Sequence, residues 1–153
     1  MRVGLISDTH GLLRPQALDF LRGSAHILHA GDVTGPDILE RLGELAPVSA
    51  VRGNNDRGAW AAGLPHALRL ELGGVGVYMV HDLKELDIDP AAAGVRVVVA
   101  GHSHKPSCVE RAGVLYVNPG SAGRRRFTLP ISVGELLIED AQVRVRIVTL
   151  ELD

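Results

Sequence analysis

The sequence predicts a single α/β domain in which two β-sheets stack on each other and helices lie on the outside. The length of 153 residues suits one domain with one hydrophobic core. Up to residue 56, patterns of buried strands alternate with helical patterns, whereas strand patterns joined by short turns dominate after residue 67. No repeat, linker or low-complexity tract divides the chain, so residues 1–153 are treated as one domain.

The first third of the chain alternates strictly between strands and helices. Residues 2–7, 25–30 and 47–51 are apolar runs that read as buried strands. A short helix is predicted over 15–21, with proline near its start, and a second over 38–45, opened by Gly35-Pro36-Asp37. This alternation predicts parallel strands with right-handed crossovers, and functional loops after the carboxyl ends of the strands.

The remaining chain reads mainly as antiparallel strands. Residues 67–72 and 75–80 form a predicted hairpin around Gly73-Gly74, and residues 83–93 hold at most one helical turn. A buried strand is predicted over 95–100 and a second hairpin over 107–111 and 114–117. The last two strands, 131–138 and 143–150, are expected to pair around Glu139-Asp140.

Composition excludes several classes of partner. The net charge of −2 gives no basic footprint for nucleic acid. Cys108 is the only cysteine, which excludes an internal disulfide and fits a reducing compartment. Strand-like sequence begins at residue 2 without a signal peptide, and no apolar run reaches the roughly 20 residues of a membrane helix. We therefore expect a cytoplasmic protein without membrane contact, and leave open whether it forms a homo-oligomer.

Polar side chains follow five of the predicted strands. Asp8 and His10 come first, and in extended backbone residues two apart point the same way, so both could reach one point. The other four groups are Asp32, Asn54 to Asp56, His81, and His102 with His104. If the strands share a sheet, these groups converge. Oxygen and imidazole ligands without thiolate suit Mn, Fe, Zn or Ni.

The candidate ligands outnumber what one ion needs, which predicts two metal ions. Two neighbouring ions need a bridging anionic ligand, for which Asp32 is the candidate. Such a pair can deprotonate a water and hold an oxyanion, which suits in-line attack on phosphorus.

The motifs Asp8-x-His10, Gly31-Asp32, Gly53-Asn54, His81 and Gly101-His102-x-His104 resemble those of the calcineurin-like metallophosphoesterases, in the order of that family. The resemblance extends from Val3 to about Ile138. The segment Arg52-Gly-Asn-Asn-Asp56 is similar to the small, single-domain bacterial and archaeal phosphodiesterase branch. The resemblance implies a metallo-dependent phosphatase-like fold: a four-layer α/β/β/α sandwich with two mixed β-sheets flanked by helices.

The resemblance also implies a role for each residue. Asp8, His10 and His104 would hold the first ion, Asn54, His81 and His102 the second, and Asp32 would bridge both. The implied activity is a two-metal-dependent phosphodiesterase that hydrolyses a small phosphodiester or nucleotide through a metal-bridging hydroxide. Mn²⁺ is the expected ion, with Fe, Ni or Zn as alternatives. The candidate catalytic residues are Asp32, Asn54, His102 and Asp56, of which Asp56 is expected to orient ligands or cap a turn.

Two positions depart from the family pattern. The wider family has His where this chain has Asn55, and that His is proposed to protonate the leaving group; an amide cannot do so. The family usually has Gly where this chain has Asp82. The candidate substrate-binding residues are Asn55, Arg124 and Arg126. The competing interpretation is that the arginines are simply a run of charges exposed to solvent.

Two other functions compete with the diesterase. One relative of this fold, the small scaffold subunit of the retromer coat, serves chiefly as an interaction platform, but a scaffold has no need of an intact ligand set. A phosphomonoesterase is disfavoured because monoesters prefer an acid for the leaving group, which Asn55 does not supply. His29 is expected to be a buried histidine with a backbone partner rather than a ligand.

Overall fold

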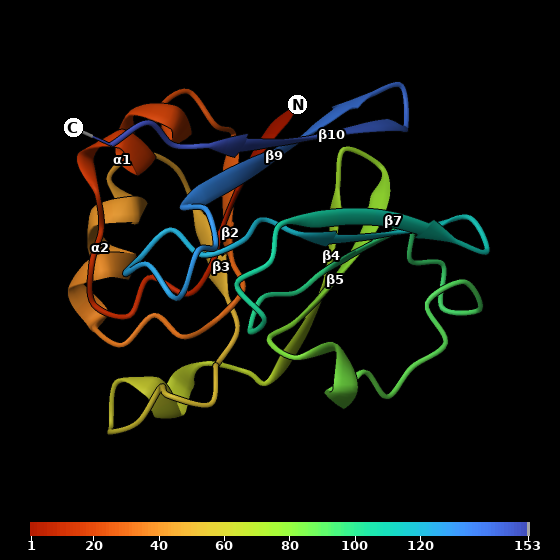
Figure 1. Cartoon of the computed structure of the whole chain (residues 1–153). Helices are drawn as coiled ribbons and strands as arrows, with labels where there is room; N and C mark the ends of the chain where they lie inside the picture. Colours follow the sequence, from red (N-terminus) through yellow and green to blue (C-terminus); the bar gives the residue numbers. More distant parts are fainter. Residues whose placement is uncertain (153) are drawn as a thin grey trace.

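The computed structural model describes residues 1–152, which form two mixed five-stranded β-sheets (Figure 1). The first sheet has the strand order β10-β9-β1-β2-β3. Its strands are β1 (Arg2–Ile6), β2 (His26–His29), β3 (Val48–Ala50), β9 (Ser132–Glu139) and β10 (Gln142–Thr149). The pairs β1–β2 and β2–β3 are parallel, as the alternation of strands and helices predicts. The crossovers are α1 (Pro15–Leu21) and α2 (Pro36–Gly43).

The amino- and carboxyl-terminal parts of the chain meet in this sheet. Strand β9 pairs antiparallel with β1, so that Val3 lies opposite Leu136, and β10 extends the sheet beyond β9. The sequence predicted the β9–β10 pair from its turn. It did not predict that this pair lies next to β1, because nothing local to either segment specifies a partner so distant along the chain.

The second sheet has the order β4-β5-β6-β8-β7. Its strands are β4 (Ala67–Leu72), β5 (Val75–Val80), β6 (Val97–Val99), β7 (Ser107–Arg111) and β8 (Val114–Asn118). Both predicted hairpins are confirmed, β4–β5 and β7–β8, while β6 pairs in parallel with β5 and β8. Two short 3₁₀ turns complete the elements, η1 (Ala61–Gly63) and η2 (Leu83–Glu85). The turn η1 was not predicted.

The main core lies between the two sheets. Leu5 and Leu28 of the first sheet share it with Val77, Met79 and Val97 of the second, and all five are fully buried. A second cluster joins the first sheet to α1 and α2, whose apolar residues pack on its outer face. These layers match the predicted sandwich. The outer face of the second sheet differs: the segment after η2 covers it with Ile88, and no α-helix of residues 1–152 lies there.

The sandwich brings five strand ends to one edge. Ser7 and the residues after it follow β1, Asp32 follows β2, and the 53–56 turn follows β3 in the first sheet. In the second sheet His81 follows β5 directly, and residues 101–104 follow β6. Because parallel strands end at the same edge, and the two sheets face each other, the polar segments of both sheets meet. None of the helices in residues 1–152 has the length and hydrophobicity needed to cross a membrane.

Candidate metal centre

The backbone that carries the candidate ligands is left-handed at most of them. Asp8, His10, Asp32, His102 and His104 have φ values of 54°, 46°, 56°, 72° and 63°. Asp8 and His10 do converge as expected, but the predicted reason, an extended backbone through both residues, is wrong. The chain leaves β1 in a tight turn, and this turn directs both side chains into the site. Left-handed backbone costs an ordinary residue roughly 1–2 kcal/mol, so the surrounding contacts must hold it in place.

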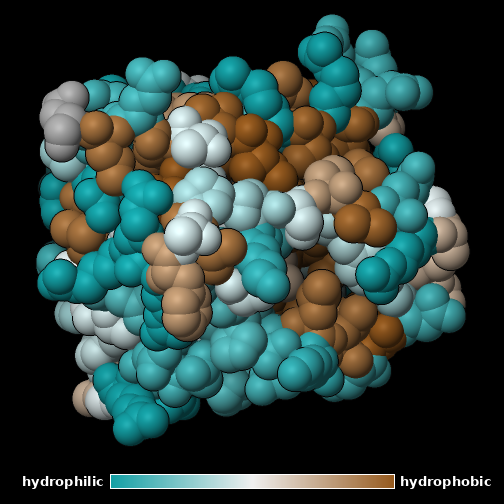
Figure 2. All heavy atoms as spheres, viewed as in Figure 1, coloured by the Kyte–Doolittle hydropathy of each residue, from teal (hydrophilic) through white to brown (hydrophobic). Residues whose placement is uncertain are grey.

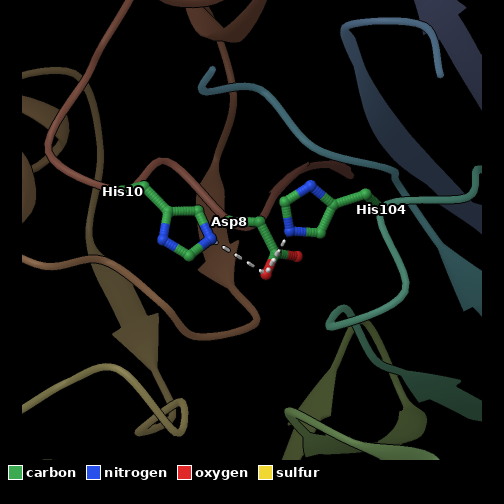
Figure 3. A group of neighbouring side chains, drawn as sticks. All are labelled: Asp8, His10 and His104. Carbon is green, nitrogen blue, oxygen red and sulfur yellow. Dashed lines mark ion pairs between the residues drawn. The ribbon is translucent and has the colours of Figure 1, made fainter. Parts of the chain in front are cut away.

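The first cluster consists of Asp8, His10 and His104. Figure 3 shows the two imidazole rings on either side of the Asp8 carboxylate, both directed at the same oxygen. The Nε2 atoms of His10 and His104 lie 3.8 Å and 3.4 Å from Asp8 Oδ1. Asp8 and His104 are buried, and His10 is half-buried.

The second cluster consists of Asp8, Asp32 and His81. His81 Nε2 lies 3.3 Å from Asp32 Oδ2 and 3.8 Å from Asp8 Oδ1. The other ring nitrogen, Nδ1, donates to the Ala30 carbonyl at 2.7 Å, which directs Nε2 toward the two carboxylates. Asn54 Oδ1 lies 3.1 Å from the same Nε2 atom. Asp32 also reaches the first cluster, because its Oδ2 lies 3.6 Å from His10 Nε2.

These residues fit divalent metal ions. Asp8 Oδ1 and His10 Nε2 are buried and have no hydrogen-bond partner within residues 1–152, which is costly unless something else satisfies them. Ligand atoms that share one ion at bonds of about 2.0–2.2 Å stand about 3–3.5 Å apart. The separations in both clusters are close to this spacing. Carboxylate oxygen with imidazole nitrogen is also a donor set that suits such ions.

Among the candidate histidine and carboxylate ligands, His102 is the one that lies outside both clusters. Its side chain is 45% exposed, and its Nε2 lies 3.6 Å from Asp82 Oδ2. Its ring meets the His81 ring edge to face, with centroids 5.2 Å apart. His102 therefore lies at the rim of the site and faces Asp82, the residue that stands where the related family usually has glycine.

Asp56 holds the backbone beneath Asp32. Its carboxylate accepts hydrogen bonds from the amides of Asp32, Thr34 and Gly53 at 3.0, 2.8 and 2.8 Å. This is the orienting arrangement that the sequence suggested for Asp56. The structure adds Gly53 to the site, because a Cβ at that residue would lie 2.2 Å from both Asp32 N and Asp32 Oδ1.

Sequence reasoning missed the residues that hold Asp8. The Ser7 hydroxyl donates to Asp8 Oδ2 at 2.7 Å, and the His102 amide donates to the same oxygen at 3.1 Å. The Ser121 hydroxyl, from the loop after β8, donates to the Asp8 carbonyl at 3.1 Å. No spacing rule would have found Ser121, because it is far from Asp8 in the sequence.

His29 is fully buried beside the site and is not part of either cluster. The Gly31 amide donates to its Nδ1 at 3.1 Å, so Nε2 carries the proton and donates to the Thr9 hydroxyl at 3.1 Å. The Thr9 hydroxyl in turn donates a hydrogen bond to the Val33 carbonyl. Burial lowers the pKa of His29 to about 4, so the ring is neutral. The expected backbone partner of His29 is confirmed.

The electrostatics of the site favour a cation. Burial opposes ionisation of Asp32, but hydrogen bonds from His81 and Asn55 outweigh it and hold the pKa of Asp32 well below its usual range. The pKa of Asp8 is lowered as well, because hydrogen bonds and the nearby histidines outweigh its burial. Burial disfavours the charged form of His81, yet the two carboxylates outweigh this and raise its pKa to about 9. The ionised carboxylates thus keep a positive charge between them.

The candidate substrate-binding residues lie at the margin of this arrangement. Asn55 donates from its backbone amide to Asp32 Oδ1 at 2.8 Å and from its side-chain Nδ2 to Asp32 Oδ2 at 3.0 Å. Arg124 and Arg126 are exposed and form no ion pair with other residues of the described chain. Arg126 lies on the His10 side, where its charge adds to the burial that lowers the pKa of His10.

The chain matches a protein-family model and a curated relative of the same kind. Residues 1–141 match the model of the calcineurin-like phosphoesterase superfamily domain. A probable metallophosphoesterase of Methanothermobacter thermautotrophicus is 36% identical over 160 aligned residues, covering 97% of this chain and 92% of the relative.

Two solved structures share the fold. Vps29 of Entamoeba histolytica in complex with Zn²⁺ is 26% identical, with a TM-score of 0.75 and coverage of 97% of this chain and 99% of that one. The structure of an archaeal phosphodiesterase superposes with a TM-score of 0.79 at 23% identity, covering 97% of this chain and 100% of that one.

Proposed function

Since the chain belongs to the calcineurin-like phosphoesterase superfamily and is a phosphoesterase, we propose that it hydrolyses a small phosphodiester or nucleotide with the help of two divalent metal ions. Mn²⁺ is the proposed ion. The observation that supports this most directly is the convergence on one atom: the Nε2 atoms of His10, His81 and His104 lie 3.8, 3.8 and 3.4 Å from Asp8 Oδ1.

The proposed ligands divide between two ions. Asp8, His10 and His104 would hold one ion, and Asn54, His81 and His102 would hold the other. The Asp32 carboxylate would reach both. The position of Asp8 Oδ1 between His10, His81 and His104 makes Asp8 a second shared residue. Bound ions would lower the pKa of a water and neutralise charge on the phosphate.

Other residues of the chain hold the proposed ligands in position. Asp56 and Asn55 fix the backbone and carboxylate of Asp32, and Ala30 holds the His81 ring with Nε2 directed toward the two carboxylates. His102, exposed at the rim, is positioned to contact a phosphate oxygen or an ion once the substrate is bound. Arg126, on the His10 side, and its neighbour Arg124 would attract the negative charge of the substrate.

No residue of this set is a strong acid for the leaving group. The Asn55 amide has no useful acidity and already donates to Asp32. Diesters with acidic leaving groups are therefore the proposed preference, and monoesters, whose transition states gain more from a proton donor, are the weaker substrates. A non-catalytic interaction scaffold of the same fold is the alternative, and the likeness to Vps29 is what favours it.

The test uses the whole chain, stripped with a chelator and reloaded with single metals. We expect activity on bis(4-nitrophenyl) phosphate to disappear with the metal, to return best with Mn²⁺, and to exceed activity on 4-nitrophenyl phosphate. Full activity in protein that elemental analysis shows to be free of metal would exclude the metal mechanism. Reloaded protein that binds metal but hydrolyses no diester would instead support the scaffold.

A further inference from the structure

A cleft of about 340 Å³ opens beside the metal centre. Its volume falls within the range of about 300–1,000 Å³ that small-molecule sites occupy. The first residues of the segment after β5, the loop after β6 and the outer face of β7 and β8 surround it. His102 and Asp82 line it at the end that adjoins the candidate metal site. An ester group on a phosphate held beside His102 can therefore extend directly into the cleft.

Part of the cleft wall is apolar. The described residues expose four large hydrophobic side chains, and two of them, Leu83 and Val109, line this cleft at 43% exposure each. Val109 lies on β7, an edge strand whose five residues are all exposed. An exposed apolar residue on an edge strand favours aggregation, so natural edges usually avoid it. In the space-filling view, hydrophobic residues also gather between β7 and the chain that follows β5 (Figure 2).

One wall is flat and cationic. The Arg111 guanidinium lies over the Tyr116 ring, 5.5 Å from its centroid, and both residues line the cleft. Tyr116 is partly buried and packs against the buried cluster on the outer face of the second sheet, which holds the ring in place. Lys84 adds a second positive charge. A guanidinium stacked on an aromatic ring, facing aliphatic side chains, favours another flat π-system that is attached to an anion.

We propose that this cleft binds an aromatic ester group of the phosphodiester substrate, and so selects aryl or nucleobase-bearing diesters over alkyl diesters. The inference rests on the proposed function, because it places the reacting phosphate beside His102. Leu83 and Val109 contact the ring on its apolar faces. Arg111 and Lys84 attract the phosphate anion and contact the edge or face of the ring. Asp82 does not oppose this, because its Oδ1 accepts from the Lys84 amide and its Oδ2 faces His102.

The experiment compares phenyl, cyclohexyl and methyl esters of 4-nitrophenyl phosphate, which share one leaving group. With Mn²⁺-loaded protein we expect kcat/KM for the phenyl ester to exceed that for the other two esters by about 10-fold, because partial burial of one aromatic ring stabilises binding by about that factor. The substitutions Val109→Asn and Leu83→Asn should each bring the ratio of kcat/KM between the phenyl ester and the other esters close to one. Cys108→Asn is the matched control, because it places the same side chain on the other face of β7 and lies outside the cleft.

A binding measurement tests whether the cleft accepts an aromatic ring without requiring that the protein hydrolyse a substrate. In Zn²⁺-loaded protein, phenylphosphonate should shift the methyl NMR signals of Val109 and Leu83, and methylphosphonate should not. The inference is overturned if the variants keep the wild-type ester ratio, if phenyl and cyclohexyl esters react alike, or if those methyl signals do not move. A protein that hydrolyses no diester at all refutes the proposed function instead, and the phosphonate shifts would still report on the cleft.

Discussion

The Asn55 side chain donates a hydrogen bond to the Asp32 carboxylate, with Nδ2 lying 3.0 Å from Oδ2. Its backbone amide binds the other carboxylate oxygen at 2.8 Å. The residue that stands where related phosphoesterases have a histidine therefore holds a proposed metal ligand and supplies no proton. Because Asn55 donates no proton, the leaving group itself has to be acidic enough to depart as an anion.

The first prediction is a steep dependence of rate on the leaving group. In a series of aryl and alkyl diesters, wild-type kcat/KM should fall sharply as the pKa of the leaving alcohol rises, since no acid protonates it. Asn55→His should flatten the dependence and raise rates on poor leaving groups, because general acid catalysis contributes about 10²–10⁴-fold. Asn55→Gln, an amide of similar chemistry, is the control and should stay steep. A flat wild-type profile, with chemistry rate-limiting, would show that another residue donates the proton.

The second prediction separates Asp32 from His10 by metal content. Asp32 reaches both clusters, through contacts of 3.3 Å to His81 and 3.6 Å to His10. Asp32→Ala should therefore lower the occupancy of both sites, whereas His10→Ala should mainly empty one. Turnover of Asp32→Ala should fall by at least the roughly 10–100-fold that loss of a residue supporting a ligand costs. Elemental analysis of the purified variants measures this, and equal metal content in Asp32→Ala and wild type would contradict a bridging role.

The third prediction concerns the close approach of Gly53 to Asp32. A methyl group at Gly53 would lie 2.2 Å from Asp32 Oδ1, so Gly53→Ala should displace the carboxylate and reduce metal binding and turnover by about 10–100-fold. Gly43 in α2 has no neighbouring atom within 4 Å of such a group. Gly43→Ala should leave activity unchanged. Calorimetry and activity assays on both variants check the pair, and unchanged metal affinity in Gly53→Ala would show that the site tolerates the displacement.

A fourth prediction addresses the arginines after Gly123. If Arg126 attracts the substrate phosphate, Arg126→Gln should raise KM for a diester several-fold and leave the metal content unchanged. Arg144→Gln, on the exposed face of β10, removes the same charge far from the site and serves as the control. The effect should weaken with added salt, because exposed charges are screened. If KM is the same in both variants, Arg126 belongs to a solvated charge run.

The fifth prediction concerns stability and pH at Glu135, which joins β9 to β1 and β10. Glu135 is 3% exposed, and its carboxylate binds the Arg2 guanidinium and accepts a hydrogen bond from Arg146 Nε at 2.8 Å. Burial alone would raise the pKa of Glu135, but the two arginines outweigh it and hold the pKa below the ordinary value of 4.5. The unfolded chain therefore takes up this proton at higher pH than the folded protein.

The stabilisation from Glu135 should thus be complete above about pH 4.5 and be lost as the pH falls through the lower folded value. Glu135→Gln should destabilise the protein by about 1–3 kcal/mol at pH 7, and by less near pH 3. Glu139→Gln, exposed at the end of the same strand, should have little effect at either pH. Urea unfolding at the two pH values measures the difference in unfolding free energy between wild type and Glu135→Gln. If this difference does not shrink in acid, the charge of Glu135 is not what stabilises the fold.

The sequence by itself determined the local elements and the identity of the candidate ligands. The helix over 15–21 and the hairpin over 67–80 occur where proline and the Gly73-Gly74 turn place them, because turn chemistry and hydrophobic period act over a few neighbouring residues. The polar motifs that follow the strands could be identified from the sequence for the same reason, because each consists of a few neighbouring residues. Parallel strand order places the groups of one sheet at a common edge, and the stacking of the two sheets brings the groups of both together.

Only the tertiary structure decided how that meeting is achieved. The left-handed backbone at Asp8 and His10 is strained by itself, and it is held by contacts with distant segments such as Ser121. The pairing of β9 with β1, the placement of His102 at the rim and the use of Asn55 to hold Asp32 likewise depend on residues brought together by packing. Local sequence specifies which groups are available, but the free energy that fixes their geometry comes from contacts between segments far apart in the chain.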